Sequence, residues 1–278
     1  MLRIADDLID AALRVARRPS RDAAQDVHFL RTTTKRLRAL LQLIRPVIEG
    51  TAFERESARL KKAAFRLAPF RDRAVAGETL KALGKSSAIL WQSGLADCLG
   101  KVRSAASRRS AMRAAGRDLE QSRLGFHRMR IRGEGWAAFG PGLMKIYRQT
   151  RRRMKAAYAH PSDEAFHRWR IRVKQLDYLL QWLEPVWPKR FSKMRRNLRE
   201  LEKKLGADHD LVVLRNLLDE TPRDFDEAAI EQVKRAAAKS SRHLRRLSAP
   251  LGAKALSVTP RRFRRACGRR WRGWKMRS

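Results

Sequence analysis

Apolar residues recur three and four positions apart along almost the whole chain of 278 residues. This spacing gathers apolar side chains on one face of an α-helix, and strand-like alternation is confined to the short stretch ALSVTP, residues 255–260. Prolines and glycines separate the periodic segments and mark their ends. The pattern predicts an all-α fold, with helices at about 2–18, 23–45, 52–67, 71–83, 86–120, 142–158, 163–184, 189–205, 209–220, 226–247 and 260–274.

One helical segment occurs twice, 139 positions apart. Residues 27–47 read VHFLRTTTKRLRALLQLIRPV, and residues 166–186 read FHRWRIRVKQLDYLLQWLEPV. A second helix follows each copy and ends in a related turn, LAPFRD (67–72) or LGADHD (205–210). A repeat of about half the chain predicts two helical bundles related by a pseudo-twofold axis.

The span GEGWAAFGPG (133–142) is rich in glycine and lies near the middle of the chain, where it separates the two copies. Glycine-rich spans commonly connect periodic segments. We therefore expect a single domain over residues 1–278, with a first repeat half at 1–132 and a second at 133–278.

The repeated helix carries a stripe of hydrogen-bond donors opposite its leucines. A step of about 100° per residue places the donors on one narrow face, while Leu30, Leu37, Leu40 and Leu41 lie on the other side. The stripe contains no acidic residue, so its cations repel one another and an external anion would relieve them. In the first copy the stripe consists of His28, Arg31, Lys35, Arg38 and Gln42.

The second copy keeps most of this stripe, as His167, Arg170, Lys174 and Gln181. Asp177 replaces the last arginine, and we expect it to pair with one of the neighbouring cations, Lys174 or Arg170. Arg172 falls toward the apolar side, where the sequence offers no reason for it.

The net charge is the compositional outlier, because 65 basic residues face 28 acidic ones and leave a formal charge of +37. Self-repulsion of this size destabilises a compact chain, so the charge predicts a polyanionic partner. Nucleic acid, inorganic polyphosphate and an anionic membrane surface all fit. With 43% apolar residues the chain can still bury a core, which excludes a disordered tail.

Two further segments concentrate positive charge. In GLMKIYRQTRRRMKAAY (142–158) the motif spacing recurs, and this helix would widen a basic surface beside the second motif helix; its stripe consists of Lys145, Arg148, Arg152 and Lys155. The segment PRRFRRACGRRWRGWKMR (260–277) has no acid. Phe263, Trp271 and Trp274 would anchor it with its arginines outward, and a loosely ordered basic tail is the alternative.

Signals for a membrane span, a signal peptide, disulfide bonds or a zinc site are weak or absent in the sequence. No apolar run approaches the roughly 18 residues of a membrane span, and the first helix carries acids inside its apolar run, which makes it a poor signal peptide. Cys98 and Cys267 are too few for a disulfide framework and suit a reducing cytoplasm. No zinc-ligand spacing occurs, and we expect neither a metal nor another cofactor.

Three roles stay open for the two motif histidines, His28 and His167. Nearby positive charge favours neutral imidazole, which can donate a hydrogen bond to phosphate or to a neighbouring helix. The two rings can instead form part of a metal site, or one can carry a phosphoryl group. In the later turns, Asp72 and Asp210 are expected to cap helices or to interact with helix dipoles, while Arg71 and His209 can reach an anion.

These residues resemble a known family. Two copies of HxxRxxxK before a leucine-rich helix, each with a later LGxxRD-like turn, are similar to the CHAD family, the conserved-histidine α-helical domain. The segment WAAFGPGLMKIYRQTRRRMKAA (136–157) resembles the opening helix of that family's second half, and the likeness covers about residues 1–275. The first turn departs from the family by lacking glycine, and the second has His209 in place of arginine.

The resemblance implies two pseudo-symmetric helical bundles that bind inorganic polyphosphate, and association with cytoplasmic polyphosphate granules. No EXEXK motif of a CYTH triphosphate-tunnel domain occurs, so the resemblance implies a stand-alone binder. By motif position the binding residues would be His28, Arg31, Lys35, Arg38, His167, Arg170 and Lys174.

The leading hypothesis is therefore a non-enzymatic polyphosphate-binding protein, with affinity that grows with chain length and falls with salt. A DNA- or RNA-binding protein is the second hypothesis, although helix-turn-helix, RNP and zinc-finger signals are absent from the sequence. The third is an enzyme of phosphate chemistry with a phosphohistidine, although there is no P-loop.

Overall fold

The computed structural model describes residues 1–87, 95, 99, 104–220 and 226–276. Within these ranges the regular elements are ten long α-helices and two short 3₁₀ helices, with no strand. The predicted all-α class is confirmed. The stretch ALSVTP forms the end of one helix and the connection to the next.

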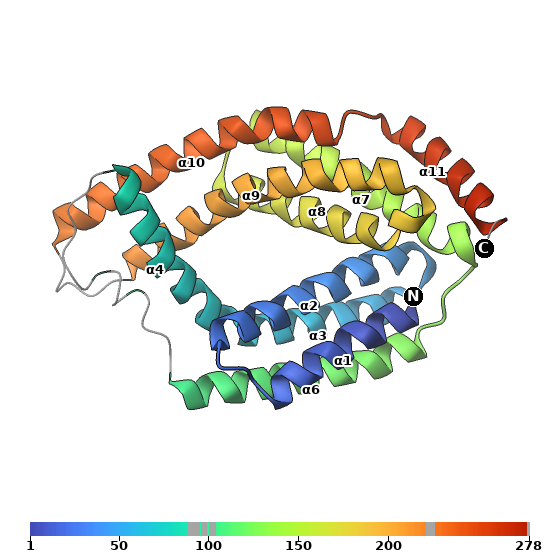
Figure 1. Ribbon diagram of the computed structural model, residues 1–278, viewed down its shortest axis with the longest axis horizontal. Coiled ribbons are helices and arrows are strands. Elements are labelled where there is room, and N and C mark those ends of the chain that lie inside the picture. The colour runs from blue at the N-terminus through green and yellow to red at the C-terminus, as the bar shows by residue number, and fades with distance from the viewer. Residues whose placement is uncertain (88–94, 96–98, 100–103, 221–225, 277–278) are drawn as a thin grey trace.

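Four helices from the first part of the chain pack together. They are α1 (Leu2–Arg17), α2 (Ala23–Ile44), α3 (Gly50–Arg66) and α6 (Ala105–Arg128). In Figure 1 they occupy the lower half of the molecule, with α2 on the side that faces the other helices. The Asp22 side chain caps α2 by accepting a hydrogen bond of 2.9 Å from the backbone N–H of Gln25.

Five helices from the second part form the upper group in Figure 1. They are α7 (Gly135–Ala159), α8 (Asp163–Trp182), α9 (Pro188–Asp219), α10 (Glu227–Ala255) and α11 (Pro260–Lys275). Helix α9 packs along both α8 and α10, and α11 packs on α7. The short helices η1 (Arg45–Val47) and η2 (Glu184–Val186) follow the two motif helices α2 and α8 at equivalent places.

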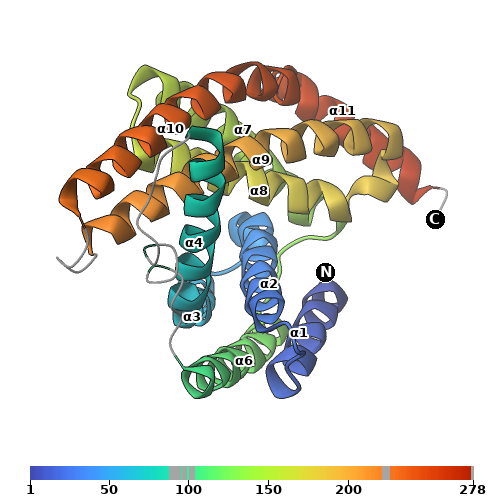
Figure 2. The same ribbon diagram turned by 60° about the vertical axis from the view of Figure 1, so that its left-hand side comes forward.

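Helix α4 (Ala68–Ser87) joins the two groups. It leaves α3 after Leu67 and crosses to pack on α9 and α10, as Figures 1 and 2 both show. Its apolar residues Ala76, Leu80 and Leu83 share a separate small core with residues of the upper group, Leu211, Leu214, Leu218 and Val233. Packing in this small core attaches α4 to the upper group, while its first turns contact α2 and α3 of the lower group.

The main core runs through both groups and contains the leucine faces of both motif helices. Leu30 and Leu37 of α2 are fully buried, as are Leu176 and Leu179 of α8. Glycine allows α7 to approach α2 closely, because a Cβ at Gly142 would lie 1.7 Å from the Leu43 carbonyl oxygen. The predicted orientation of the repeated helix is therefore confirmed, and α7 lies directly beside it.

Three predicted boundaries were wrong. Residues 189–205 and 209–220 form one helix, α9, and the expected turn LGADHD lies inside it, so Asp210 caps no helix. Most of the expected glycine-rich connection already belongs to α7, and within this span two glycines, Gly133 and Gly135, have positive φ angles. Helix α10 continues through Pro250 to Ala255. In each case burial of one helix face continues past the local breaker and outweighs its cost.

The remaining predicted helices agree to within a few residues, apart from the segment 86–120. Part of that segment, residues 88–94, 96–98 and 100–103, lies outside the described residues. Its last part belongs to α6, which begins at Ala105 and continues to Arg128. The basic C-terminal segment is a helix, and Phe263 is buried as predicted.

Substituting Gly206 by alanine is expected to raise the free energy of unfolding by about 0.5–1 kcal/mol, because glycine inside a helix costs about that much relative to alanine. The added Cβ would lie 3.6 Å from the nearest atom, Nη2 of Arg170, which is an ordinary contact. Urea denaturation of both proteins measures the difference. A loss of stability would contradict a continuous α9 and favour a helix end at Gly206.

No helix among the described residues combines the length and the apolar character needed to cross a lipid bilayer.

Candidate polyanion-binding site

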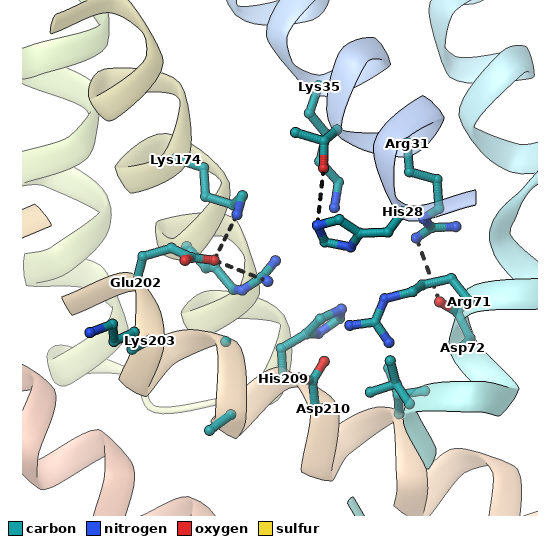
Figure 3. Close-up of a pocket in the computed structure, with 16 residues that line it drawn as sticks. His28, Arg31, Lys35, Arg71, Asp72, Lys174, Glu202, Lys203, His209 and Asp210 are labelled. Carbon is teal, nitrogen blue, oxygen red and sulfur yellow. Dashed lines mark hydrogen bonds and ion pairs between the residues drawn. The ribbon is translucent and has the colours of Figure 1, made fainter. Parts of the chain in front are cut away.

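A pocket of about 450 Å³ lies between α2, α4, α8 and α9 (Figure 3). The two motif helices, 139 positions apart in the sequence, contribute cations to the same pocket. Helices α4 and α9 complete it. The basic residues that line it are His28, Arg31 and Lys35 from α2, Arg71 from α4, Arg170 and Lys174 from α8, and Lys203 and His209 from α9.

Carboxylates from the facing helices also enter the pocket. Asp72 of α4 lies 3.5 Å from Arg31, and Glu202 of α9 lies 3.3 Å from Arg170 and 2.8 Å from Lys174. The expectation that no acid relieves the donor stripe was wrong, because it considered each helix alone. Asp72 lies inside α4, which begins at Ala68, so of its two expected roles the helix cap was wrong.

Positive charge still exceeds negative charge in the pocket. Six lysine and arginine side chains line it against three carboxylates, those of Asp72, Glu202 and Asp210. Burial opposes ionisation of Glu202, yet Lys174 and Arg170 hold its pKa below the usual value. Burial raises the pKa of Asp210, while the charges of Arg170 and Arg71 oppose this rise. The pocket therefore favours an anion.

Lys35 is a pocket cation without an ion pair among the described residues. Burial, followed by the charges of Arg31 and Arg170, lowers the pKa of its amine from 10.5 to about 7. Among the described residues, no carboxylate lies within ion-pair distance of it, although Glu202 stands across the pocket. An anion placed between the two motif helices would favour the charged amine.

Two guanidinium groups of the pocket hold buried N–H donors that lack a hydrogen-bond partner. These atoms are Nη1 of Arg31 and Nε of Arg170. Buried polar groups are hydrogen-bonded in most proteins, so an unsatisfied donor in a pocket indicates a place for an acceptor. One such donor comes from each copy of the motif.

The two motif histidines have different partners. The side chain of His28 lies in the pocket, with its Nε2 3.4 Å from the hydroxyl oxygen of Thr32. His167 instead faces His209, and their Nδ1 atoms are 3.2 Å apart, so one ring donates to the other. Burial and the charges of His167 and Arg170 lower the pKa of His209 to about 3.

Burial is also the main cause that lowers the pKa of His28 and of His167, with added contributions from Arg71 and from Arg170 respectively. All three imidazoles are thus neutral near pH 7. Neutral imidazole carries one N–H donor and one acceptor. In Figure 3 His28, Arg71 and His209 point toward the centre of the pocket.

A second pocket of about 200 Å³ adjoins the first and shares the cations Arg31, Lys35, Arg170 and Lys174 and the neutral His209. It adds Arg38 and His167, together with Tyr178 and Gln175. Burial lowers the pKa of Arg38. The motif stripe therefore continues from the first pocket toward the C-terminal half of α2.

Two residues of the second motif helix find partners that the sequence did not indicate. Asp177 accepts a hydrogen bond of 3.2 Å from Arg195 of α9, so its expected pairing with Lys174 or Arg170 was wrong. Arg172 donates to the side-chain oxygen of Gln175 at 2.6 Å. Arg172 is partly buried, and this hydrogen bond satisfies one of its donors.

The four predicted cations of α7 lie outside both pockets. Lys145 is partly buried beside η1 and α8, and its pKa is lowered by burial and by the charges of Arg45 and Arg172. Arg148, Arg152 and Lys155 are exposed.

Sequence reasoning missed Glu202 and Lys203. With α9 broken at Gly206, these residues stood on a different helix from His209 and Asp210. Read as one helix, positions 202, 206, 209 and 213 follow spacings of three and four residues and share one face. Continuous periodicity across Gly206 was the available signal.

Comparison with protein families identifies the family of this chain. The family model described as CHAD domain matches residues 3–219, well over half of the chain. Comparison with curated proteins finds no match. The matched range contains both motif helices and all four helices that form the pocket, while α10 and α11 follow it. The chain belongs to the CHAD domain family.

Proposed function

We propose that this protein binds inorganic polyphosphate in the pocket between α2, α4, α8 and α9, without catalysing a reaction on it. The observation that carries the proposal is the convergence of both HxxRxxxK motifs on one pocket in which cations outnumber carboxylates. The family to which the chain belongs is associated with polyphosphate binding.

Polyphosphate suits these side chains chemically. It is a flexible chain of charged groups without bases, so recognition needs only donors along its path. Arginine offers forked donors to phosphate oxygens, and lysine offers a compact charge. Arg31 and Arg170 each hold a guanidinium N–H without a partner, and a phosphate beside Lys35 would give its amine the ion pair that Glu202 and Asp210 do not form with it.

The neutral histidines fit a hydrogen-bonding role within this proposal. His28 can donate one N–H to a phosphate oxygen, and the pair of His167 and His209 keeps α8 and α9 at a fixed separation beside Arg170. A phosphoryl-carrier role for either motif histidine is the enzymatic alternative. It predicts acid-labile phosphate on the protein.

Nucleic acid is the other polyanion that the net charge allows. Single-stranded nucleic acids are commonly held by stacking of bases on aromatic side chains. Among the described residues, no phenylalanine, tyrosine or tryptophan lines the 450 Å³ pocket, and Tyr178 is the one such residue that lines the adjoining pocket. This lining favours a ligand made of phosphate alone.

Two finer statements belong to the same proposal. We propose that the halves of the domain are pseudo-twofold related, which is supported by the matched places of His28 and His167 at the N-terminal parts of α2 and α8. We also propose that the protein works in the cytoplasm on polyphosphate granules, because such granules concentrate the ligand.

Competition binding tests the proposal. Labelled long-chain polyphosphate is displaced by unlabelled polyphosphate, duplex DNA or single-stranded RNA, matched by phosphate concentration, at about 0.15 M salt. We expect only polyphosphate to compete well. We also expect log affinity to fall with log salt by roughly 0.7 per phosphate neutralised, as for single-stranded nucleic acid. Equal competition by DNA or RNA, or a flat salt response, would overturn the proposal.

A further inference from the structure

Helix α11 follows the family-matched range and is firmly attached to the rest of the molecule. Phe263 is buried and stacks on Tyr147 of α7, with ring centroids 4.2 Å apart. Trp271 packs edge-on against Phe139, also of α7, at 4.5 Å. These contacts exclude a loosely ordered tail and fix which face of α11 meets solvent.

The solvent-facing side of α11 is entirely basic. Its seven arginines are all exposed, and no acidic residue occurs after Glu231 in the sequence. Among the described residues, none of the seven forms an ion pair with a carboxylate. This differs from the central pocket, where Glu202 and Asp72 partly neutralise the cations.

Four arginines gather around a cavity of about 470 Å³ between α7 and the start of α11. Arg148 comes from α7, and Arg261, Arg264 and Arg265 come from α11. The only other lining residues in the described part of the chain are Met144 and Pro260, so no carboxylate borders the cavity. It is as large as the central pocket and more uniformly positive.

Further basic side chains lie between this cavity and the central pocket. The charges of Arg38 and Arg45 both act on Arg172, and those of Arg45, Arg172 and Arg148 act on Lys145, in each case lowering a pKa already lowered by burial. Arg38 borders the second pocket, and Arg148 borders the α11 cavity. Positive charge is therefore continuous from one site to the other.

We propose that the α7–α11 cavity is a second phosphate-binding site, and that one long polyphosphate chain occupies it and the central pocket together. The arginines of α11 would hold the chain after it leaves the central pocket past Arg38 and Lys145. This inference rests on the proposed function of the central pocket. It gives α11 and two residues of α7, Lys145 and Arg148, one shared role.

The path between the sites is long on the scale of a phosphate group. Along α2 alone, Lys35 of the central pocket and Arg45, whose charge acts on Lys145, are separated by about 15 Å at a rise of about 1.5 Å per residue. Tripolyphosphate is too short to occupy both sites, whereas a long chain can do so. Occupation of a second site by a tethered ligand raises the overall affinity by a factor of about 10²–10⁴.

Affinities for tripolyphosphate and for long-chain polyphosphate are compared in the wild type and in the triple variant Arg261→Ala, Arg264→Ala, Arg265→Ala. We expect the triple variant to bind long chains at least about tenfold more weakly, with unchanged affinity for tripolyphosphate at the central pocket. The matched control removes three exposed arginines of α6, by Arg109→Ala, Arg113→Ala and Arg117→Ala, and should change neither affinity. Circular dichroism checks that each variant keeps its helix content.

The possible results separate the two proposals. Wild-type affinity of the triple variant for long chains would overturn the second site and leave the central pocket untouched. An equal loss with the α6 control would show that only net charge matters, and would also overturn it. Absence of polyphosphate binding by the wild type would overturn the proposed function itself. A triple arginine-to-lysine variant at the same α11 positions should retain most of the long-chain affinity.

Discussion

Replacing Arg31 and Lys35 together by alanine is expected to lower the affinity for polyphosphate by about 100-fold or more, because each hydrogen bond to a charged group contributes about 1.5–3 kcal/mol. Both side chains line both pockets, and Arg31 holds a buried donor without a partner. The helix content should not change, because the leucine face of α2 packs on the opposite side. Titration with tripolyphosphate and with long-chain polyphosphate measures the loss.

A control of equal charge is available on α3. Lys61 and Lys62 are exposed and line neither pocket, so Lys61→Ala with Lys62→Ala removes two charges without changing either lining. We expect this control to reduce affinity by less than about twofold, since exposed charges are well screened at physiological salt. Equal losses in both double variants would contradict a defined site. Unfolding of the Arg31 and Lys35 variant would assign the two residues to the fold instead.

Lys35→Met is expected to raise the free energy of unfolding by about 1–3 kcal/mol at pH 6 in the absence of a polyanion, since one pKa unit corresponds to about 1.4 kcal/mol. Burial and the neighbouring arginines lower the pKa of Lys35 from 10.5 to about 7. The charged amine is therefore less stable in the folded protein than in the unfolded chain. Methionine has a similar length and carries no charge.

The sign of the pH dependence follows from the direction of this shift. Below pH 7 Lys35 is protonated in both states and its full cost is present. Between about pH 7 and 10.5 the folded state releases the proton first, so the stability of the wild type rises relative to the variant. The advantage of Lys35→Met should thus disappear near pH 10.5.

Urea denaturation at several pH values, in chloride buffer without phosphate, measures this difference. Lys61→Met serves as the control, because an exposed lysine should show no such pH-dependent gain. A less stable Lys35→Met protein at pH 6 would contradict the assignment of Lys35 as an uncompensated buried cation. Added polyphosphate should stabilise the wild type more than the variant.

The expected loss of binding and the expected gain of stability have the same cause, which is the burial of cationic side chains on α2. A buried cation such as Lys35 destabilises the free protein, and the same cation binds an anion strongly because little water has to be displaced from it. The ion pairs of Glu202 with Arg170 and Lys174 reduce this cost on the α8 side. On the α2 side more of this destabilisation remains, so substitutions of Arg31 and Lys35 test both the stability and the binding prediction.

Periodicity alone predicted the helical class, most of the helices and the orientation of α2, with Leu30 and Leu37 buried and the donors on the other face. These properties are local, because an α-helix of known spacing fixes which side chains share a face. The predicted break at Gly206 failed because the cost of a helical glycine is only about 1 kcal/mol. Packing of Leu205 and Leu211 on neighbouring helices exceeds it.

The sequence by itself determined an all-α chain of very high positive charge, with the same histidine, arginine and lysine on two helices. Only the tertiary structure decided that these helices share one pocket, that Glu202 and Asp72 enter it, and that His167 meets His209. It also placed Arg148 beside α11. The spacing of residues within a helix carries no information about which distant helix its polar face will meet, because that choice depends on the packing of the whole core.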